Sequence, residues 1–136
     1  MASADLELQG AIVARLKADT SLAALIGGRV YDQPRADAPY PQVTIGEADT
    51  LRNDAECISG EDVYVTLHAW SRAVGYPEVK RVAADVVGSL HNAELSLPTF
   101  DALAMEHRQT RVFRDPDGIT SHAVIEFVAS TYTTAN

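Results

Sequence analysis

The sequence Leu103-Ala-Met-Glu-His-Arg-Gln-Thr-Arg-Val-Phe113, then Asp115-Pro-Asp-Gly118, then Ser121-His-Ala-Val-Ile-Glu-Phe-Val-Ala-Ser130 decides the fold of the last third of the chain. Pro116 presets the φ of a turn's first corner, Asp115 is able to bond the backbone two residues on, and Gly118 accepts a positive φ. These features predict a long β-hairpin across residues 102–131. Because the first arm carries polar groups on both faces, it suits an interface better than an active site.

A second strand pair is expected upstream of this hairpin. Residues 42–47 alternate with period two, with an extension past Asp49, and residues 61–71 supply the partner strand. The polar stretch Arg52 to Gly60 is expected to be the loop between them, and Val30-Tyr31 a short strand. In the partner strand the aliphatic face is expected to pack on helices, leaving an aromatic face with Tyr64 and Trp70 for a second packing surface.

Three helices are expected from apolar spacing and end signals. The first runs from Ser3 to about Ala18 and buries a stripe made of Leu8, Ile12 and Leu16, widened by Leu6 and Val13. The second is short, capped by Thr20 or Ser21, with Leu22, Leu25 and Ile26 facing inward and Gly27-Gly28 at its end. The third starts at Pro77. Its residues recurring at i, i+3, i+4, i+7, i+8 and i+11 are expected to be buried: Val79, Val82, Ala83, Val86, Val87 and Leu90. Its solvent side is expected to hold Glu78, Lys80, Arg81, Asp85 and Ser89.

This order of elements predicts one α+β domain over residues 1–136. Locally joined strand pairs imply a largely antiparallel sheet with long β-hairpins, and two main helices are expected to pack on one of its faces. At 136 residues the chain is long enough to bury about two-thirds of its unfolded surface without staples.

Composition excludes several classes of function. Nineteen acids against eleven Lys and Arg leave a formal charge of −8, which disfavours tight binding of nucleic acid. The chain has a single cysteine, Cys57, and Met1 to Asp5 lack the pattern of a signal peptide, so we expect folding in a reducing cytoplasm. No run approaches the roughly 18 apolar residues of a membrane span, and no membrane partner is expected.

No catalytic or metal-binding pattern emerges from the reactive residues. The four histidines have no finger or H-E-x-x-H spacing; His107 and His122 are expected to make a polar contact across the hairpin rather than bind a metal. The carboxylates Glu47, Asp49, Asp54, Glu56, Glu61 and Asp62 lie among polar neighbours, which favours a solvated acidic loop over an acid–base pair. We expect neither an enzyme nor a cofactor.

Three segments in this order resemble the tail terminator, or tail completion, proteins of long-tailed phages and phage-like gene transfer agents. They are residues 28–32 with 38–47, residues 65–72 leading into the Pro77 helix, and residues 111–118 with the strand that follows. The resemblance spans nearly the whole chain, including the opening pattern from Leu8 to Leu25. It implies a small α/β domain whose copies form a ring, usually a hexamer, on the end of the tail tube. That ring ends tube growth and offers a docking surface for the head.

The resemblance implies partners and a place in the particle. They are further copies of the chain, the tail tube protein, a head-tail connector or stopper protein, and double-stranded DNA that passes through without tight binding. Assembly is expected in the producing cell's cytoplasm, and the finished ring at the head–tail junction. The negative charge suits passage of DNA, since carboxylates do not hold phosphates.

Two sets of residues are candidates for contacts in such a ring. Apolar and aromatic side chains suit an interface between subunits: Tyr31, Tyr40, Tyr64, Trp70 and Phe113. The acidic stretch is expected to line the lumen or a docking surface, through Asp49, Asp54, Glu56, Glu61 and Asp62. Two other interpretations stay open: another head-to-tail connection ring, such as a stopper or adaptor, and a small non-viral ligand-binding domain.

Overall fold

The computed structural model describes residues 1–134 and confirms the α+β prediction. Three helices and six strands follow one another along the chain. They are α1 (Ala4–Ala18), α2 (Thr20–Ile26), β1 (Val30–Tyr31), β2 (Gln42–Arg52), β3 (Ile58–Ser71), α3 (Pro77–Leu90), β4 (Asp101–Ala102), β5 (Glu106–Arg114) and β6 (Ser121–Thr134). Among the described residues, no helix is long and apolar enough to cross a bilayer.

The sheet is built around the antiparallel pair β3 and β6. Their register runs from Ile58 opposite Thr134 to Ser71 opposite Ser121, so each strand is paired along its whole length. β2 lies antiparallel on the other side of β3, and the short β1 joins β2 in parallel. β5 and β4 share the remaining edge of β6. The sequence predicts the two hairpins but not the pair that joins them.

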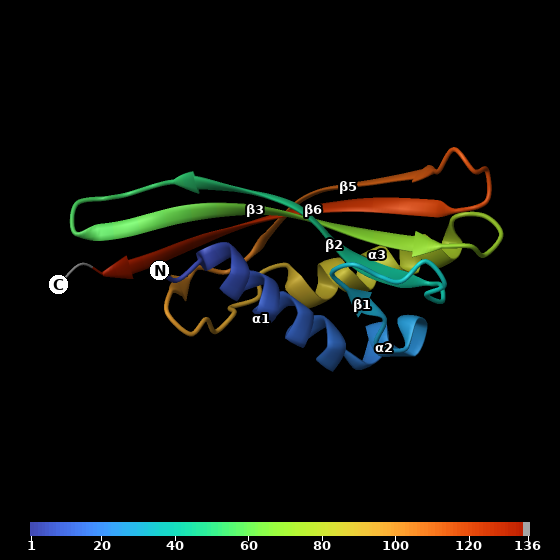
Figure 1. Cartoon of the computed structure of the whole chain (residues 1–136), viewed down its shortest axis with the longest axis horizontal. Coiled ribbons are helices and arrows are strands. Elements are labelled where there is room, and N and C mark those ends of the chain that lie inside the picture. The colour runs from blue at the N-terminus through green and yellow to red at the C-terminus, as the bar shows by residue number, and fades with distance from the viewer. Residues whose placement is uncertain (135–136) are drawn as a thin grey trace.

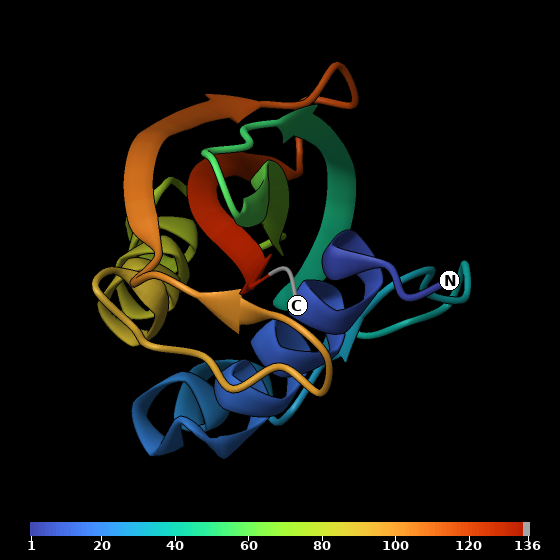
Figure 2. The same cartoon turned by 90° about the vertical axis from the view of Figure 1, so that its left-hand side faces the viewer.

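All three helices lie on one side of this long, twisted sheet (Figure 1). Seen along its length, the sheet curls so that β2 and β5 rise at its two sides, with β3 and β6 between them (Figure 2). The hairpin β2–β3 extends toward one end of the molecule, and β5–β6 toward the other (Figure 1). One sheet face is therefore covered by helices and the other is not.

The core fills the space between the helices and the covered face, as the alternation in the strands predicts. The buried positions of β3 are Val63, Val65, Leu67 and Ala69, and those of β6 are Ala123, Ile125, Phe127 and Ala129. The helices contribute Leu8, Ile12, Leu16, Leu22, Ile26, Val79, Val82, Val86 and Leu90. Side chains of alternating strand residues point to opposite faces, so this one pattern also sets which residues lie on the uncovered face.

Several helix details differ from the sequence-based expectations. Leu6 is exposed, because the buried stripe of α1 runs through Ala4, Leu8, Ile12 and Leu16 and Leu6 lies off this stripe. Ser89 of α3 is buried, and its carbonyl accepts a hydrogen bond from Arg15 Nε at 2.5 Å. The second helix is capped by Asp19, whose Oδ1 accepts from the backbone N–H of Leu22 at 3.0 Å, and not by Thr20 or Ser21. A residue that ends one helix thus caps the next.

The strand bounds also differ from expectation. The loop expected from Arg52 to Gly60 is shorter, since β2 continues to Arg52 and β3 already begins at Ile58. Conversely, the strand expected from Leu103 begins only at Glu106. Met105 before it is fully buried and its N–H donates to the carbonyl of Ala93 at 3.0 Å, which holds this segment against the end of α3 instead of in the sheet.

The β5–β6 turn confirms the role of Gly118 but not that of Asp115. Gly118 has a φ of +73°, and its N–H donates to the carbonyl of Asp115 at 3.0 Å. The carboxylate that bonds the turn backbone is that of Asp117, which accepts from the N–H groups of Thr120 and Ile119 at 2.8 and 2.9 Å. These bonds, the one from the Thr120 backbone foremost, lower the pKa of Asp117 to about 2. The side chain of Asp115 bonds His122 instead.

We expect Leu67→Ala to lower the free energy of unfolding by about 2–5 kcal/mol, because Leu67 is fully buried on the covered face of β3. Leu51→Ala is the matched control. This side chain is 55% exposed, so its loss is expected to change stability by less than about 0.5 kcal/mol. Urea unfolding followed by circular dichroism measures both, and equal losses would contradict the assignment of the covered face.

We expect Gly118→Val to destabilise the fold by about 1–2 kcal/mol, the cost of a left-handed conformation for a residue with a side chain. Apart from its two chain neighbours, no described residue has an atom within 4 Å of the Cβ position, so the positive φ is the main obstacle to the substitution. Gly10→Ala in α1 is the control, since its Cβ also meets open space; it is expected to stabilise by about 0.5–1 kcal/mol. A Gly118→Val variant that melts at the wild-type temperature would refute this role.

Candidate functional site

The uncovered face of the sheet is the surface where the candidate residues gather. It carries the residues that alternate with the buried ones on each strand. From β3 these are Asp62, Tyr64, Thr66, His68 and Trp70, and their register partners on β6 are Ser130, Val128, Glu126, Val124 and His122. One half of this face is filled by a cluster of rings and the other half is hollow.

The filled half is a ring cluster formed by His68, Trp70, Phe113 and His122. The rings of Trp70 and His122 stack with centroids 3.7 Å apart, and Phe113 lies 4.8 Å from His122. The Nε1–H of Trp70 donates to Thr44 Oγ1 at 3.0 Å. Three strands and the start of β2 therefore supply one cluster whose polar atoms are bonded within the subunit.

A chain of titratable groups, joined by two hydrogen bonds and one ion-pair contact, passes through this cluster. His122 Nδ1 lies 3.1 Å from Asp115 Oδ1, its Nε2 lies 2.7 Å from His68 Nδ1, and His68 Nε2 lies 3.4 Å from Glu47 Oε1. A carboxylate only accepts, so His122 donates through Nδ1 to Asp115. Burial lowers the pKa of His122, although the hydrogen bond and charge of Asp115 act to raise it. With His122 neutral and protonated on Nδ1, its Nε2 accepts a hydrogen bond from the Nδ1–H of His68.

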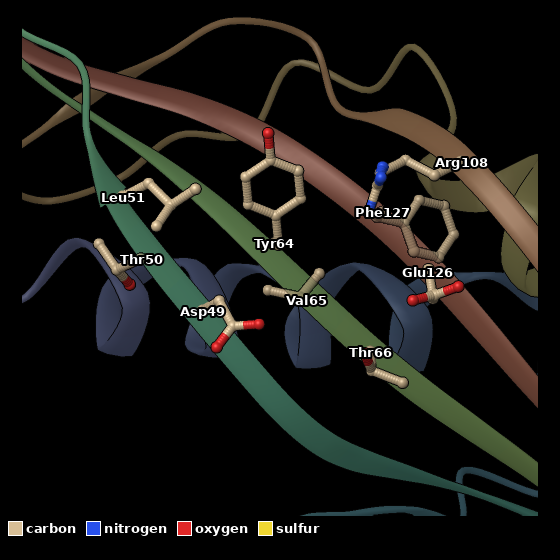
Figure 3. A pocket seen from close by; sticks show the side chains of 9 residues that line it. All are labelled: Asp49, Thr50, Leu51, Tyr64, Val65, Thr66, Arg108, Glu126 and Phe127. Atoms are coloured by element: carbon tan, nitrogen blue, oxygen red, sulfur yellow. The ribbon is translucent and has the colours of Figure 1, made fainter.

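The hollow half is a trough of about 410 Å³ (Figure 3). β2 lines it with Asp49, Thr50 and Leu51. β3 contributes Tyr64, Val65 and Thr66, β5 contributes Arg108, and β6 contributes Glu126 and Phe127. The guanidinium of Arg108 lies over the ring of Tyr64, 4.9 Å from its centroid. The charged residues of the trough are therefore Asp49 on β2, Glu126 on β6 and Arg108 on β5.

The aromatic candidates are each half-buried and most already have partners within the subunit. Trp70 and Phe113 belong to the ring cluster, Tyr64 holds Arg108, and Tyr40 lies under the guanidinium of Arg72 at 4.3 Å. Tyr31 lies apart from these rings, on β1. The structure thus gathers Tyr64, Trp70 and Phe113 on one face.

The acidic candidates lie on the projecting end of the β2–β3 hairpin, the segment 49–62, which we call the acidic arm. Asp49, Asp54 and Glu56 are exposed, and Glu61 and Asp62 are half-buried. Asp54 accepts from the N–H of Gly60 at 3.0 Å, and Asp62 accepts from Asn53 and Ser130. The side chains of Asp49, Glu56 and Glu61 have neither an ion pair nor a hydrogen bond within residues 1–134.

Sequence reasoning missed the arginines of β5. Arg108, Arg111 and Arg114 each lie over a ring, those of Tyr64, Phe113 and Tyr76 at 4.9, 5.3 and 4.7 Å. A regular strand would send Arg108 and Arg111 to opposite faces, but the register shift between His107 and Gln109 allows both to lie over rings of the uncovered face. The spacing of three was visible in the sequence, whereas the bulge was not.

The expected contact of His107 with His122 is wrong. His122 lies opposite Phe113 in the hairpin, and His107 lies opposite Phe127, because the hairpin register places them far apart along β5 and β6. Among the described residues, no group of three His, Cys, Asp or Glu side chains is placed to hold a metal ion.

We expect the free energy of unfolding to fall as pH drops below about 6.5, the ordinary pKa of histidine. The pKa of His122 is lower in the folded chain than in the unfolded chain, so the unfolded chain binds more protons in this range and gains stability relative to the folded one. His122→Gln is expected to flatten the dependence in urea titrations from pH 8 to 5, and the exposed His91→Gln to retain it. A steep loss persisting in His122→Gln would contradict this origin.

Comparisons with known proteins agree with the resemblance. The model of the family described as "Tail completion protein gp17" matches residues 10–132. The chain is 27% identical over 119 residues to the tail completion protein gp17 of Bacillus phage SPP1, covering 88% of this chain and 87% of that protein.

Two solved structures share the fold. A chain from the virion of a native gene transfer agent particle superposes with a TM-score of 0.91 at 24% identity, covering 98% of this chain and all of that one (100%). The structure of the gp17 protein of bacteriophage SPP1 superposes with a TM-score of 0.63 at 27% identity, covering 98% of this chain and 91% of that one.

Proposed function

The chain belongs to the tail completion protein gp17 family, and from this premise we propose that it is a non-enzymatic ring subunit at the head-proximal end of a tail tube. In this role it ends tube growth and provides the surface on which the head docks. The observation that carries the proposal is the family match over residues 10–132, which includes both hairpins and all three helices except the start of α1.

The uncovered sheet face supports a role in assembly. It presents tryptophan, tyrosine and arginine side chains, the types enriched where proteins bind one another. Its only chain of titratable groups among the described residues runs from Asp115 to Glu47 and ends on an exposed carboxylate. An acid–base site needs a group in a shaped, partly dry cleft. The trough is open and polar, so a contact surface fits it better.

The proposed ring contains several copies of this chain, six in the simplest case, with Tyr31, Tyr40, Tyr64, Trp70 and Phe113 near its subunit contacts. One rim meets the tail tube protein and the other a connector or stopper protein, while double-stranded DNA passes without tight binding. Assembly takes place in the cytoplasm of the producing cell, and the ring stays in the particle at the head–tail junction.

For the acidic arm we propose a docking contact with protein rather than a place in the DNA-lining lumen. The arm projects from the end of the sheet (Figure 1) and carries two exposed aliphatic side chains, Leu51 and Ile58. Apolar groups beside carboxylates are typical of a protein contact, whereas a surface that only lets DNA slide has no use for them.

We expect particles that lack this chain to carry tail tubes of uncontrolled length without attached heads, since nothing ends tube growth. Electron microscopy of the lysate measures tube length, and supplying the wild-type chain is expected to restore one length. Tubes of normal length beside unattached heads would contradict the terminator role and favour a stopper or adaptor. Normal particles would refute any role in joining head and tail.

A further inference from the structure

Charges of opposite sign lie on the β2–β3 hairpin and on β5. The acidic arm has three carboxylates without a side-chain partner within residues 1–134: Asp49 on the edge strand β2, Glu56 in the turn and Glu61 on the interior strand β3. Arg108 and Arg111 on β5 have no carboxylate partner in the described chain either.

The two arginines are held in place although they form no ion pair. Arg108 lies over the ring of Tyr64 at 4.9 Å, and Arg111 over Phe113 at 5.3 Å. Stacking on a ring fixes the guanidinium plane and leaves its N–H groups free to bind a carboxylate. Charged side chains on an edge strand can also serve to prevent pairing with a strand of another chain. That role does not need a fixed guanidinium orientation.

The acidic arm and β5 both have surface free for a partner. Among the described residues, β5 pairs only with β6, so the backbone of its other edge is open. The acidic arm adds Leu51 and Ile58, which are 55% and 42% exposed. The acidic arm therefore offers carboxylates and exposed apolar side chains, and β5 offers arginines and an open strand edge.

We propose that the acidic arm of one subunit docks against Arg108 and Arg111 on the β5 edge of the next subunit. The two patches are different surfaces, one on the β2–β3 hairpin and one on β5, so the contact is head-to-tail and repeats from copy to copy until the ring closes. The inference rests on the proposed ring and names its subunit contact. It assigns Glu56 and Glu61 as the carboxylates that meet the arginines.

Charge reversal tests the pairing. Arg108→Glu with Arg111→Glu is expected to lower the fraction of assembled protein on tail tubes at least about tenfold, because like charges then face each other across the contact. Glu56→Arg with Glu61→Arg is expected to do the same. All four substitutions in one chain restore opposite charges, and assembly is expected to return. The assembled fraction is measured by co-sedimentation with tubes from particles that lack the chain.

A matched control distinguishes the loss of this charge pairing from an effect of the changed net charge. Lys17→Glu with Arg81→Glu changes the total charge as much as the β5 pair does, at exposed positions on the helices, and is expected to assemble normally. Circular dichroism melts confirm that each variant is folded. If the β5 variant assembles as well as the control, or if the fourfold variant stays as impaired as either pair, the proposed docking is wrong.

The native Cys57, exposed near Glu56, gives a positional test. With Gln109→Cys on β5, oxidised glutathione is expected to link tube-bound subunits into a ladder of covalent oligomers. Gln109→Cys in a Cys57→Ser background is expected to yield at most dimers. Lys17→Cys with native Cys57 is expected to yield no ladder, and an equal ladder from it would overturn the inference.

Failure of this inference is distinguishable from failure of the ring function. If the docking alone is wrong, charge-reversed subunits still restore one tube length to particles that lack the chain. If the ring function is wrong, removal of the whole chain leaves tube length unchanged.

Discussion

The antiparallel pairing of β3 with β6 holds the two hairpins in one sheet. Both strands have 14 residues, and every residue of one lies opposite a residue of the other. The pairing aligns their buried side chains into one apolar face, which the three helices cover (Figure 1). Because strand side chains alternate, the same register collects His68, Trp70 and His122 on the uncovered face. A slip by one residue would bury these polar rings and expose the core.

Rings on the uncovered face bind cationic or titratable side chains rather than forming a second core. Tyr64 and Phe113 each support an arginine, while Trp70 stacks on a histidine that burial keeps neutral. Such pairs keep polar groups ordered at a surface that is still wet. In the proposed ring this order would favour contact with a partner, because less side-chain freedom is lost on binding.

The separation of charge bears on how an acidic subunit would associate with itself in the proposed ring. Each copy carries a net charge of −8, yet Arg108 and Arg111 lie on β5 and the acidic arm lies on the β2–β3 hairpin. Long-range repulsion between copies is screened within about 8 Å at physiological ionic strength, whereas groups in contact are screened less. In the proposed ring, local complementarity between the acidic arm and β5 would offset repulsion between whole subunits and would also select one orientation.

The helices, the Gly118 turn, the four long strands and the α+β class can all be derived from the sequence, because each follows from local period, end signals or backbone preference. The capping residue expected at the second helix was wrong. Asp19, Thr20 and Ser21 are all good N-cap residues, so local preference alone does not decide which of them caps the helix. Three other features needed the folded chain. The β3–β6 pair joins segments about fifty residues apart or more, the bulge at Arg108 depends on register, and Asp115 meets His122 only after the turn closes. Tertiary pairing decided which charges lie on which edge, because the sequence lists the arginines and carboxylates but not the order in which the strands lie side by side.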